Sequence, residues 1–481
     1  MNRRKRPADL PPLPQNSGVR TRKVSRRKRR TELFLYGPIV LFLVLGFFAW
    51  FTHREEPGTW MVKAGDKTTN FEYLSRARAA LSQSGDTAWI EDGEGNVVDM
   101  NQGIARLNVY APSVNTQGTI ENTDTTSYYN GASAPDALFI RSSDDGRQYL
   151  IELSGVRMWI DQEDAVLDPR PDAAASSWMV QDGALIHMVL ENDGSYASYA
   201  VGPAPDALEE NQAYFSWDGN WFYDDFDKLS ADARANTHRQ AVNSEAYYNP
   251  YQYLNMFSDF GISAEQVNAF LEANDHADDS VLYDNYDLFT QVQAETGVNA
   301  ALMLSQALNE SGYGTSEYAT KRSNLFGHAA YDDNPDAASS YDTLEEGIAD
   351  HAKSYMLESY GRLGSDHFHG AFAGNKAAGI NVDYASDPWW GEKSASFLWR
   401  LDTDHALLSR NLWIGLAPGN VQVYDRPDGT VLGTFSAGEL LSLEILSEEE
   451  HGGQTWYAVQ PFFTLNGQLP ETMYIPKSQL S

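Results

Sequence analysis

One predicted helix is apolar on nearly every face, and it strongly limits how the chain can fold. Asn299 can cap its first turn, and the helix is expected to run to about Asn309. A helix of this kind lies inside a domain, because none of its sides favours contact with water. Its apolar residues are Ala300, Ala301, Leu302, Met303, Leu304, Ala307 and Leu308.

Glu310 stands where this helix ends. The negative end of the helix dipole and an apolar neighbourhood both disfavour a carboxylate, so both raise the pKa of its side chain. A general acid that must keep its proton near neutral pH needs such a shift. The turn Ser311–Gly314 leaves space beside the carboxyl. On spacing alone, however, a glutamate at a helix end is more often a solvated surface residue.

Composition excludes several classes of function. The chain has 481 residues, which exceeds one compact domain, and no cysteine, which excludes disulfides, cysteine-ligated zinc and cysteine nucleophiles. Residues 1–30 hold 12 Lys and Arg and the single acid Asp9, so the net charge of −32 leaves −43 for the rest. Such an acidic body will not bind nucleic acid by neutralising phosphates.

An uncharged apolar run, Leu33–Phe51, follows the basic terminus. As a helix it would span about 28 Å, close to the ~30 Å hydrocarbon core of a bilayer. The basic residues of Arg26–Arg30 predict a single-pass protein with its amino terminus in the cytoplasm and its bulk outside. The alternative is a cleaved signal peptide, but the run is longer than the usual ~7–15 residues and no small-x-small cleavage site follows.

Two regions show the short alternating runs and turn residues of β-strands, one from about residue 96 to 240 and one from 410 to 481. YLIELSGVRMWIDQEDAVL in the first, and more clearly VYDRPDGTVLGTFSAGELL in the second, resemble bacterial SH3-like modules. Such modules would hold an enzyme on a cell wall or merely pack on its core. The polar stretch 52–95 is interpreted as a spacer with one helix around Phe71–Leu81.

The pattern between residues 241 and 409 is helical. Residues 264–274 place Val267, Phe270 and Leu271 on one face. A second helix covers Asp284–Thr296 and ends at Gly297, and the last covers Gly391–Leu401.

Four motifs in this region resemble the glucosaminidase family of peptidoglycan hydrolases. They are ALNESGYGTSEYAT, SNLFGHAAYDD, YDTLEEGIADHAKSY and GINVDYASDPWWGEK, and they cover roughly Asn299–Leu401. The resemblance implies a lysozyme-like, mainly α-helical catalytic domain. It also implies an endo-β-N-acetylglucosaminidase that cuts the β-1,4 bond between N-acetylglucosamine and N-acetylmuramic acid in wall glycan strands.

The resemblance also implies site residues. Glu310 matches the family's general acid, and Tyr384 matches a tyrosine near the reacting sugar. One of the two tryptophans after Pro388 is expected to stack on a sugar and the other to enter the core. The expected substrate-binding residues are Tyr313, Asn324, Phe326, Tyr331, Asp332, Asp387, Trp389 and Trp390.

The second catalytic group stays open. A capping box at Thr343 and turn formation in the YDDNPD loop explain the available acids equally well. The substrate's own N-acetyl group could attack instead, as in some glycosidases, with Tyr384 orienting it. The candidate carboxylates are Asp332, Asp333, Asp342 and Glu345.

Two departures from the family pattern, Asp383 and His328-Ala329, predict a more acidic groove than usual. His367 and His369 are spaced like a metal pair, but no convergent acid accompanies them, so no metal or cofactor is assigned.

The predicted architecture is multidomain: a basic cytoplasmic tail (1–32), a transmembrane helix (33–51), a spacer (52–95), a β-rich SH3-like region (96–240), a lysozyme-like domain (241–409) and an SH3-like small β-barrel (410–481). The predicted partners are peptidoglycan strands and, through one helix, the cell membrane; protein partners are unknown. A lytic transglycosylase that releases 1,6-anhydro products and a non-catalytic wall-binding scaffold are the alternatives.

Overall fold

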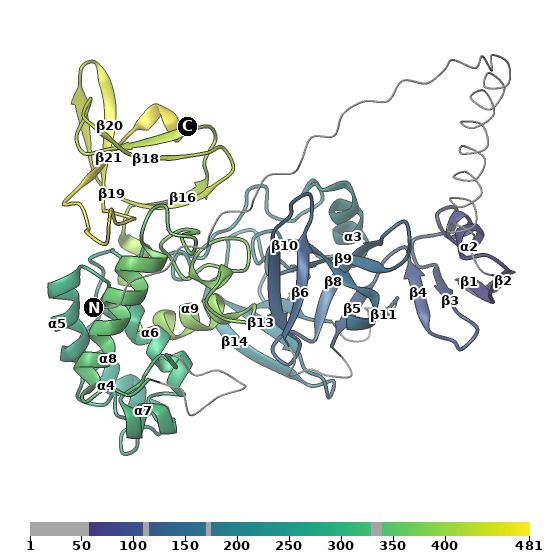
Figure 1. The fold of residues 1–481 in the computed structure, drawn as a ribbon, viewed down its shortest axis with the longest axis horizontal. Coiled ribbons are helices and arrows are strands. Elements are labelled where there is room, and N and C mark those ends of the chain that lie inside the picture. The colour runs from purple at the N-terminus through teal and green to yellow at the C-terminus, as the bar shows by residue number, and fades with distance from the viewer. Residues whose placement is uncertain (1–56, 109–114, 170–174, 329–338) are drawn as a thin grey trace, which may run out of the picture. The chain divides into compact units, whose positions relative to one another are not determined.

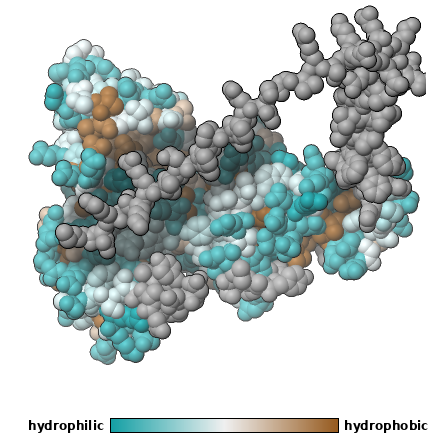
Figure 2. All heavy atoms as spheres, viewed as in Figure 1, coloured by the Kyte–Doolittle hydropathy of each residue, from teal (hydrophilic) through white to brown (hydrophobic). Residues whose placement is uncertain are grey.

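The computed structural model describes residues 57–108, 115–169, 175–328 and 339–481. Gly58–Ser481 forms one compact unit (Figure 1). Four antiparallel sheets and a helical region make up this unit, with β-structure on both sides of the helices in the sequence. Figure 2 shows a largely hydrophilic surface with hydrophobic residues gathered in a few patches.

The first sheet has the strand order β2-β1-β3-β4, and the helix α2 (Leu74–Leu81) packs beside it. The sequence analysis predicted the helix here but treated the rest of the stretch as a spacer. The strands are β1 (Trp60–Ala64), β2 (Lys67–Phe71), β3 (Trp89–Glu91) and β4 (Val97–Met100).

The second sheet has seven strands in the order β11-β5-β8-β9-β10-β6-β7. Its β9–β10 hairpin turns at Ser154 and Gly155, which both have positive φ, as a two-residue hairpin requires. The strands are β5 (Ile104–Leu107), β6 (Asn115–Ile120), β7 (Thr126–Asn130), β8 (Asp136–Ser142), β9 (Gln148–Leu153), β10 (Val156–Asp161) and β11 (Ala165–Asp168), with the short helix η1 (Gln162–Asp164) before β11.

The third sheet has the order β14-β13-β12-β15 and precedes the helix α3 (Phe226–Ala235). In it Trp178 on β12 pairs with His187 on β13. Its strands are β12 (Ser177–Gln181), β13 (Ala184–Leu190), β14 (Tyr196–Pro203) and β15 (Ala213–Tyr214).

The helical region is built around α6 (Ala300–Ser311), the helix predicted to be buried on every side. The Asn299 side chain accepts the N–H of Leu302 at 2.8 Å, which confirms the predicted cap. Gly297 ends the preceding helix in the left-handed conformation, also as predicted. The other helices are α4 (Ala264–Ala273), α5 (Tyr286–Thr296), α7 (Glu317–Arg322), α8 (Leu344–Asp350), the π-helix η4 (His351–Tyr360), η5 (Ile380–Val382), α9 (Trp390–Leu401) and η6 (Ala406–Ser409).

The carboxyl-terminal sheet has six strands in the order β16-β19-β20-β21-β17-β18. The alternating pattern at 410–481 correctly predicted strands in this region. The strands are β16 (Leu412–Leu416), β17 (Val421–Tyr424), β18 (Val431–Phe435), β19 (Leu440–His451), β20 (Gln454–Val459) and β21 (Met473–Pro476), followed by η7 (Lys477–Gln479).

The predicted fold class needs correction in two respects. No helix in the described part of the chain is long and apolar enough to cross a bilayer, so a single-pass membrane protein is not supported. The longest helices there have 12 residues, which span about 18 Å against ~30 Å of hydrocarbon. The predicted segment 33–51 and the basic tail lie outside the described residues.

The second correction concerns the SH3-like assignments, which are not supported. Residues 96–240 form parts of several sheets, the largest with seven strands, rather than one small module. The alternating pattern correctly indicated strands in both β-rich regions, but alternation does not determine strand order. The prediction of β-rich regions before and after a helical domain is confirmed.

Candidate active site

Glu310 lies in the last turn of α6 and is half-buried. Its Oε1 accepts a hydrogen bond of 2.5 Å from the indole Nε1 of Trp390, the first residue of α9. On the other side the loop after α7 comes close, since a Cβ at Gly327 would lie 3.8 Å from Glu310 Oε2. Two helices and one loop therefore fix the position of this carboxyl.

Burial raises the pKa of Glu310 to about 7. The Trp390 hydrogen bond opposes this effect because it stabilises the carboxylate, whereas the negative charge of Asp387 adds to it. The direction agrees with the expectation from sequence, but the causes found are burial and a neighbouring charge. Glu310 can thus hold its proton near neutral pH and still release it.

Tyr384 lies beside this carboxyl. Its ring centroid is 4.6 Å from that of Trp390, and its hydroxyl donates to the Phe326 carbonyl at 3.3 Å. Burial and the Glu310 charge raise the pKa of Tyr384 well above its ordinary value, so its hydroxyl stays protonated. The structure therefore brings the two residues predicted to be catalytic together.

Asp387 is the neighbouring carboxylate that acts on Glu310. Its Oδ2 binds the Lys393 ammonium at 2.5 Å, and its Oδ1 accepts the backbone N–H of Trp389 at 2.9 Å. The side chain thus caps the turn that leads into α9, and it places a negative charge near the acid.

A buried lysine supports the loop that carries Tyr384. Lys376 is 1% exposed and donates to the carbonyls of Asn381 at 3.0 Å and Ala385 at 2.6 Å. Its ammonium lies 4.0 Å from the centre of the Tyr128 ring, and the Tyr128 hydroxyl donates to the Asp383 carbonyl at 2.6 Å. Burial lowers the pKa of Lys376 to about 8. A strand of the second sheet, β7, therefore contacts the loop directly.

The β9–β10 hairpin also reaches this region. Ser154 Oγ donates to the Pro388 carbonyl at 2.7 Å, and the Lys376 N–H donates to the Ser154 carbonyl at 3.2 Å. A Cβ at Gly155 would come within 2.8 Å of the Asn375 side chain, so the close approach and the positive φ both require glycine there.

Several residues predicted to bind substrate are structural. Asn324 is buried and its amide donates to the carbonyls of His328 and Ser339 at 3.0 and 3.1 Å. Phe326 is buried in a parallel stack on His351, with ring centroids 3.6 Å apart. Their side chains hold the loop beside Glu310 in place.

The two tryptophans have different environments. Trp390 contacts the acid, whereas Trp389 is 1% exposed and packs in the core of the second sheet. Tyr313 faces α4 and α9 through contacts with Phe270 and Phe397. Trp390 is also buried, at 3% exposed, so neither tryptophan has a face open to a sugar, and the expectation that one of them stacks on a sugar ring is not met. Tyr331 and Asp332 lie outside the described residues.

Among the candidates for a second carboxylate, Glu345 is exposed and accepts from Gln291 at 2.8 Å. Asp342 is also exposed, and its N–H donates to Glu346 in the α8 cap at 3.0 Å. Asp333, like Asp332, lies outside the described residues. The described part of the chain therefore does not place a second carboxylate with an evident catalytic role.

A series of hydrogen-bonded side chains connects the loop after α7 to the helix α6. His328 contacts the Tyr341 hydroxyl at 2.8 Å and His351 at 3.1 Å, and His351 contacts Gln306 of α6 at 2.9 Å. Burial lowers the pKa of His328 to about 4 and that of His351 well below its ordinary value. His328 is therefore an uncharged, buried residue of this chain.

His367 and His369 both contact the carboxylate of Asp383, at 3.2 and 2.9 Å. The hydrogen bond from His369 is the main reason that the pKa of Asp383 is lowered. The carboxylate that was expected to make the groove acidic is thus hydrogen-bonded by two imidazole rings. Within the described ranges, no group of three or more His, Cys, Asp or Glu side chains is arranged to hold a metal ion.

A cavity of about 560 Å³ lies between the β9–β10 turn, the segment 368–378 and the carboxyl-terminal sheet. His369 lines it, but Glu310 does not. The chemistry that can cleave a bond is at Glu310, so we place the candidate active site there.

Comparison with known proteins finds similarity in the same part of the chain. The glucosaminidase family model, described as mannosyl-glycoprotein endo-beta-N-acetylglucosaminidase, matches residues 286–403. This segment is similar to the glucosaminidase family. It runs from α5 through α9 and contains Glu310, Tyr384 and Trp390.

Two kinds of curated relative are similar to part of this chain. A putative endo-beta-N-acetylglucosaminidase of Streptococcus pneumoniae serotype 4 is 31% identical over 265 residues, which is 54% of this chain and 35% of the relative. A bifunctional autolysin of Staphylococcus aureus is 28% identical over 170 residues, 31% of this chain and 13% of the relative. The chain thus spans about a third or less of the length of these relatives.

Similarity of the glucosaminidase domain to solved structures is weak. The S. aureus Autolysin E structure has a TM-score of 0.23 and 20% identity, and the match covers 32% of this chain and 72% of that one. A TM-score this low supports no structural inference.

Sequence reasoning gave no role to several residues that shape the site. Glu392 and Lys393 stand in the quoted motif GINVDYASDPWWGEK, where charged residues next to two tryptophans were the available signal. His187, Lys376 and Gly327 had no local signal, because their contacts depend on the tertiary fold.

Proposed function

We propose that this chain is a peptidoglycan hydrolase, an endo-β-N-acetylglucosaminidase that cleaves the β-1,4 bond between N-acetylglucosamine and N-acetylmuramic acid. The observation that carries the proposal is the half-buried Glu310, with a pKa raised to about 7, within the segment that matches the glucosaminidase family. The names of the pneumococcal and staphylococcal relatives support the same reaction class and a cell-wall substrate.

In this mechanism Glu310 acts as the general acid. Its carboxyl gives a proton to the glycosidic oxygen as the bond from that oxygen to the anomeric carbon breaks. Water then supplies a hydroxyl group to the anomeric carbon, and its remaining proton returns to Glu310. The negative charge of Asp387 favours the protonated resting form of Glu310, and the Trp390 indole stabilises the carboxylate formed during bond cleavage.

Tyr384 is proposed to contact the reacting sugar. Its protonated hydroxyl can donate to the acetamido oxygen of the substrate if it exchanges its 3.3 Å bond to the Phe326 carbonyl. An acetamido group oriented in this way can attack the anomeric carbon, in which case the protein needs no second carboxylate. Asp332 and Asp333 are the protein groups that could take this role instead.

Digestion of purified peptidoglycan followed by mass spectrometry tests the proposal. We expect soluble fragments with a reducing N-acetylglucosamine end, and no release by the Glu310→Gln variant. Fragments that end in 1,6-anhydro-muramyl groups would instead identify a lytic transglycosylase. Binding to sacculi without release of reducing ends would identify a wall-binding scaffold.

A further inference from the structure

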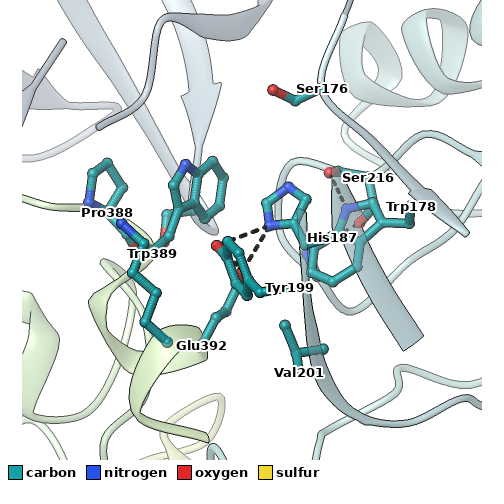
Figure 3. A network of polar contacts seen from close by, with 12 residues as sticks. Ser176, Trp178, His187, Tyr199, Val201, Ser216, Pro388, Trp389 and Glu392 are labelled. Carbon is teal, nitrogen blue, oxygen red and sulfur yellow. Dashed lines mark hydrogen bonds and ion pairs between the residues drawn. The ribbon is translucent and has the colours of Figure 1, made fainter. Parts of the chain in front are cut away.

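A buried polar cluster joins the third sheet to the start of α9 (Figure 3). His187 Nδ1 on β13 lies 2.7 Å from Glu392 Oε2 in the first turn of α9. The Tyr199 hydroxyl on β14 donates to the same oxygen at 3.3 Å. His187 and Glu392 are 1% and 3% exposed, so water cannot replace this contact if it is lost.

Two tryptophan rings fix the His187 imidazole. Trp178 on β12 stacks on it, with centroids 3.9 Å apart and planes 5° apart. Trp389 contacts it edge-on at 4.7 Å. The Trp178 indole donates to the Ser216 carbonyl at 2.9 Å, so the stacking ring is itself anchored (Figure 3).

The contacts of this cluster flank Trp390 in the sequence. Trp389 precedes it and Glu392 follows two residues later, and both are held by strands of the third sheet. Trp390 itself donates to Glu310 at 2.5 Å. The third sheet therefore determines where α9 begins, and thereby where the indole N–H points. A catalytic group keeps its geometry only if the residues around it are held in this way.

The similarity to the pneumococcal relative extends over 265 residues and is thus longer than the family segment 286–403. The His187 strand lies well before that segment.

We propose that His187 and Glu392 are positioning residues for the glucosaminidase reaction: they hold Trp390 in hydrogen-bond contact with Glu310, so that the third sheet is a working part of the active site. This inference rests on the proposed function. Without the His187–Glu392 contact α9 can shift at its first turn, and Glu310 loses its hydrogen-bond donor.

The loss has a defined electrostatic consequence. Among the described residues, the groups that face Glu310 are the Trp390 indole from α9, Asp387 with its partner Lys393 from the turn before α9, and the Tyr384 hydroxyl. Of these only the indole lowers the pKa of Glu310. A displaced indole therefore moves the alkaline limb of the pH–rate profile to higher pH.

The test compares Glu392→Ala with Glu392→Gln in the full chain, using purified peptidoglycan. We expect Glu392→Ala to lower kcat by roughly 10- to 100-fold, because small displacements of catalytic groups have effects of this size. Its alkaline limb should shift upward. Glu392→Gln keeps an acceptor for His187 and should restore most of both properties.

Glu444→Ala is the matched control. Glu444 is also a 3% exposed glutamate at a contact between regions, where it binds Arg410 and accepts from Ser258 at 2.7 Å. This variant should lose stability yet keep the wild-type pH profile. Identical profiles for Glu392→Ala and Glu444→Ala would overturn the proposal. If Glu392→Ala fails to fold, Tyr199→Phe replaces it, because that change removes one hydroxyl from the cluster.

The indole ¹H–¹⁵N resonance of Trp390 provides a readout that needs no turnover. Its chemical shift should change in Glu392→Ala and remain unchanged in Glu444→Ala. An unchanged chemical shift in both variants would also overturn the proposal. A wild-type enzyme without hydrolytic activity would refute the proposed function, and the resonance would still report whether His187 and Glu392 position Trp390.

Discussion

Two glutamates lie at the first turn of α9: Glu310 contacts this turn, and Glu392 belongs to it. They differ in their hydrogen-bond partners. Glu310 meets the neutral Trp390 indole and the negative charge of Asp387, and its pKa is raised to about 7. Glu392 meets His187 and the Tyr199 hydroxyl in a fully enclosed cluster. A half-buried carboxyl with a raised pKa is suited to proton transfer, whereas a carboxyl enclosed by two hydrogen-bonding side chains is suited to anchoring.

The largest expected effect comes from Glu310→Gln. We expect activity to fall by roughly 10²- to 10⁴-fold, because the variant has no proton to give to the leaving oxygen. Its thermal stability should stay equal or increase, because glutamine removes the cost of burying a carboxylate. Reducing-end release and a thermal melt measure the two properties.

Glu317→Gln is the control for that variant, since Glu317 is an exposed residue of α7 that pairs with Lys321 at 2.8 Å. It should behave as wild type. A Glu310→Gln enzyme with full activity would refute the catalytic role.

Glu392→Ala should lower the stability of the protein more than a substitution of Glu310 does. Removing the Glu392 carboxyl leaves the buried His187 with only the 3.4 Å contact to the Tyr199 hydroxyl, which is expected to lower the free energy of unfolding by about 1–3 kcal/mol. Glu310→Ala should change it less, because the half-buried Glu310 can be replaced by water. Urea denaturation of both variants measures the difference, and a larger loss for Glu310→Ala would contradict the comparison.

Trp390→Phe should lower kcat by roughly tenfold, the size expected for one lost hydrogen bond to a charged group. The ring remains against Tyr384, but the N–H that stabilises the Glu310 carboxylate is lost. The pKa of Glu310 should therefore rise, and the alkaline limb of the pH–rate profile should move up with it.

Trp456→Phe is matched to that change, because the buried Trp456 indole lies in the carboxyl-terminal sheet without a hydrogen-bond partner. Trp456→Phe should leave the alkaline limb of the pH–rate profile unchanged. An unchanged limb in Trp390→Phe would show that the indole does not set the acidity of Glu310.

His328 is expected to affect the pH dependence of stability and not the activity. Its pKa of about 4 in the folded chain lies below its ordinary 6.5, so the unfolded chain binds a proton first as the pH falls. Its contribution is complete above about pH 6.5 and is lost between there and pH 4. At pH 5 one such histidine lowers the free energy of unfolding by about 2 kcal/mol.

Urea denaturation at pH 7 and pH 5 checks this in the Glu310→Gln background, where the opposite titration of Glu310 is absent. The same change in stability between the two pH values in a variant that also carries His328→Gln would show that His328 is not held neutral.

The sequence predicted the elements that carry their own signals. Asn299, the apolar helix and Gly297 define α6 and the end of α5 locally, and the raised pKa of Glu310 followed from its place at the end of an apolar helix. The alternating pattern at 410–481 likewise identified strands, among them β17. Each of these features is determined by residues that are close together in the sequence, so it could be predicted from the sequence.

What local reasoning missed depends on residues far apart in the sequence. Trp390 meets Glu310 across 80 residues, and Glu392 meets His187 across 205. The tandem tryptophans gave no local sign of which one faces the acid; the third sheet decides this by enclosing Trp389. The membrane helix was predicted from apolar length alone, and no element of the described residues supports it.

The pKa of Glu310 is the quantity on which this account depends most. Glutamate labelled with ¹³C at the carboxyl carbon, with the Glu310 signal assigned by comparison with Glu310→Gln, reports it directly by NMR between pH 4 and pH 9. The account predicts titration near pH 7. Titration near 4.5, the ordinary glutamate value, in an enzyme that remains fully active at neutral pH would contradict it.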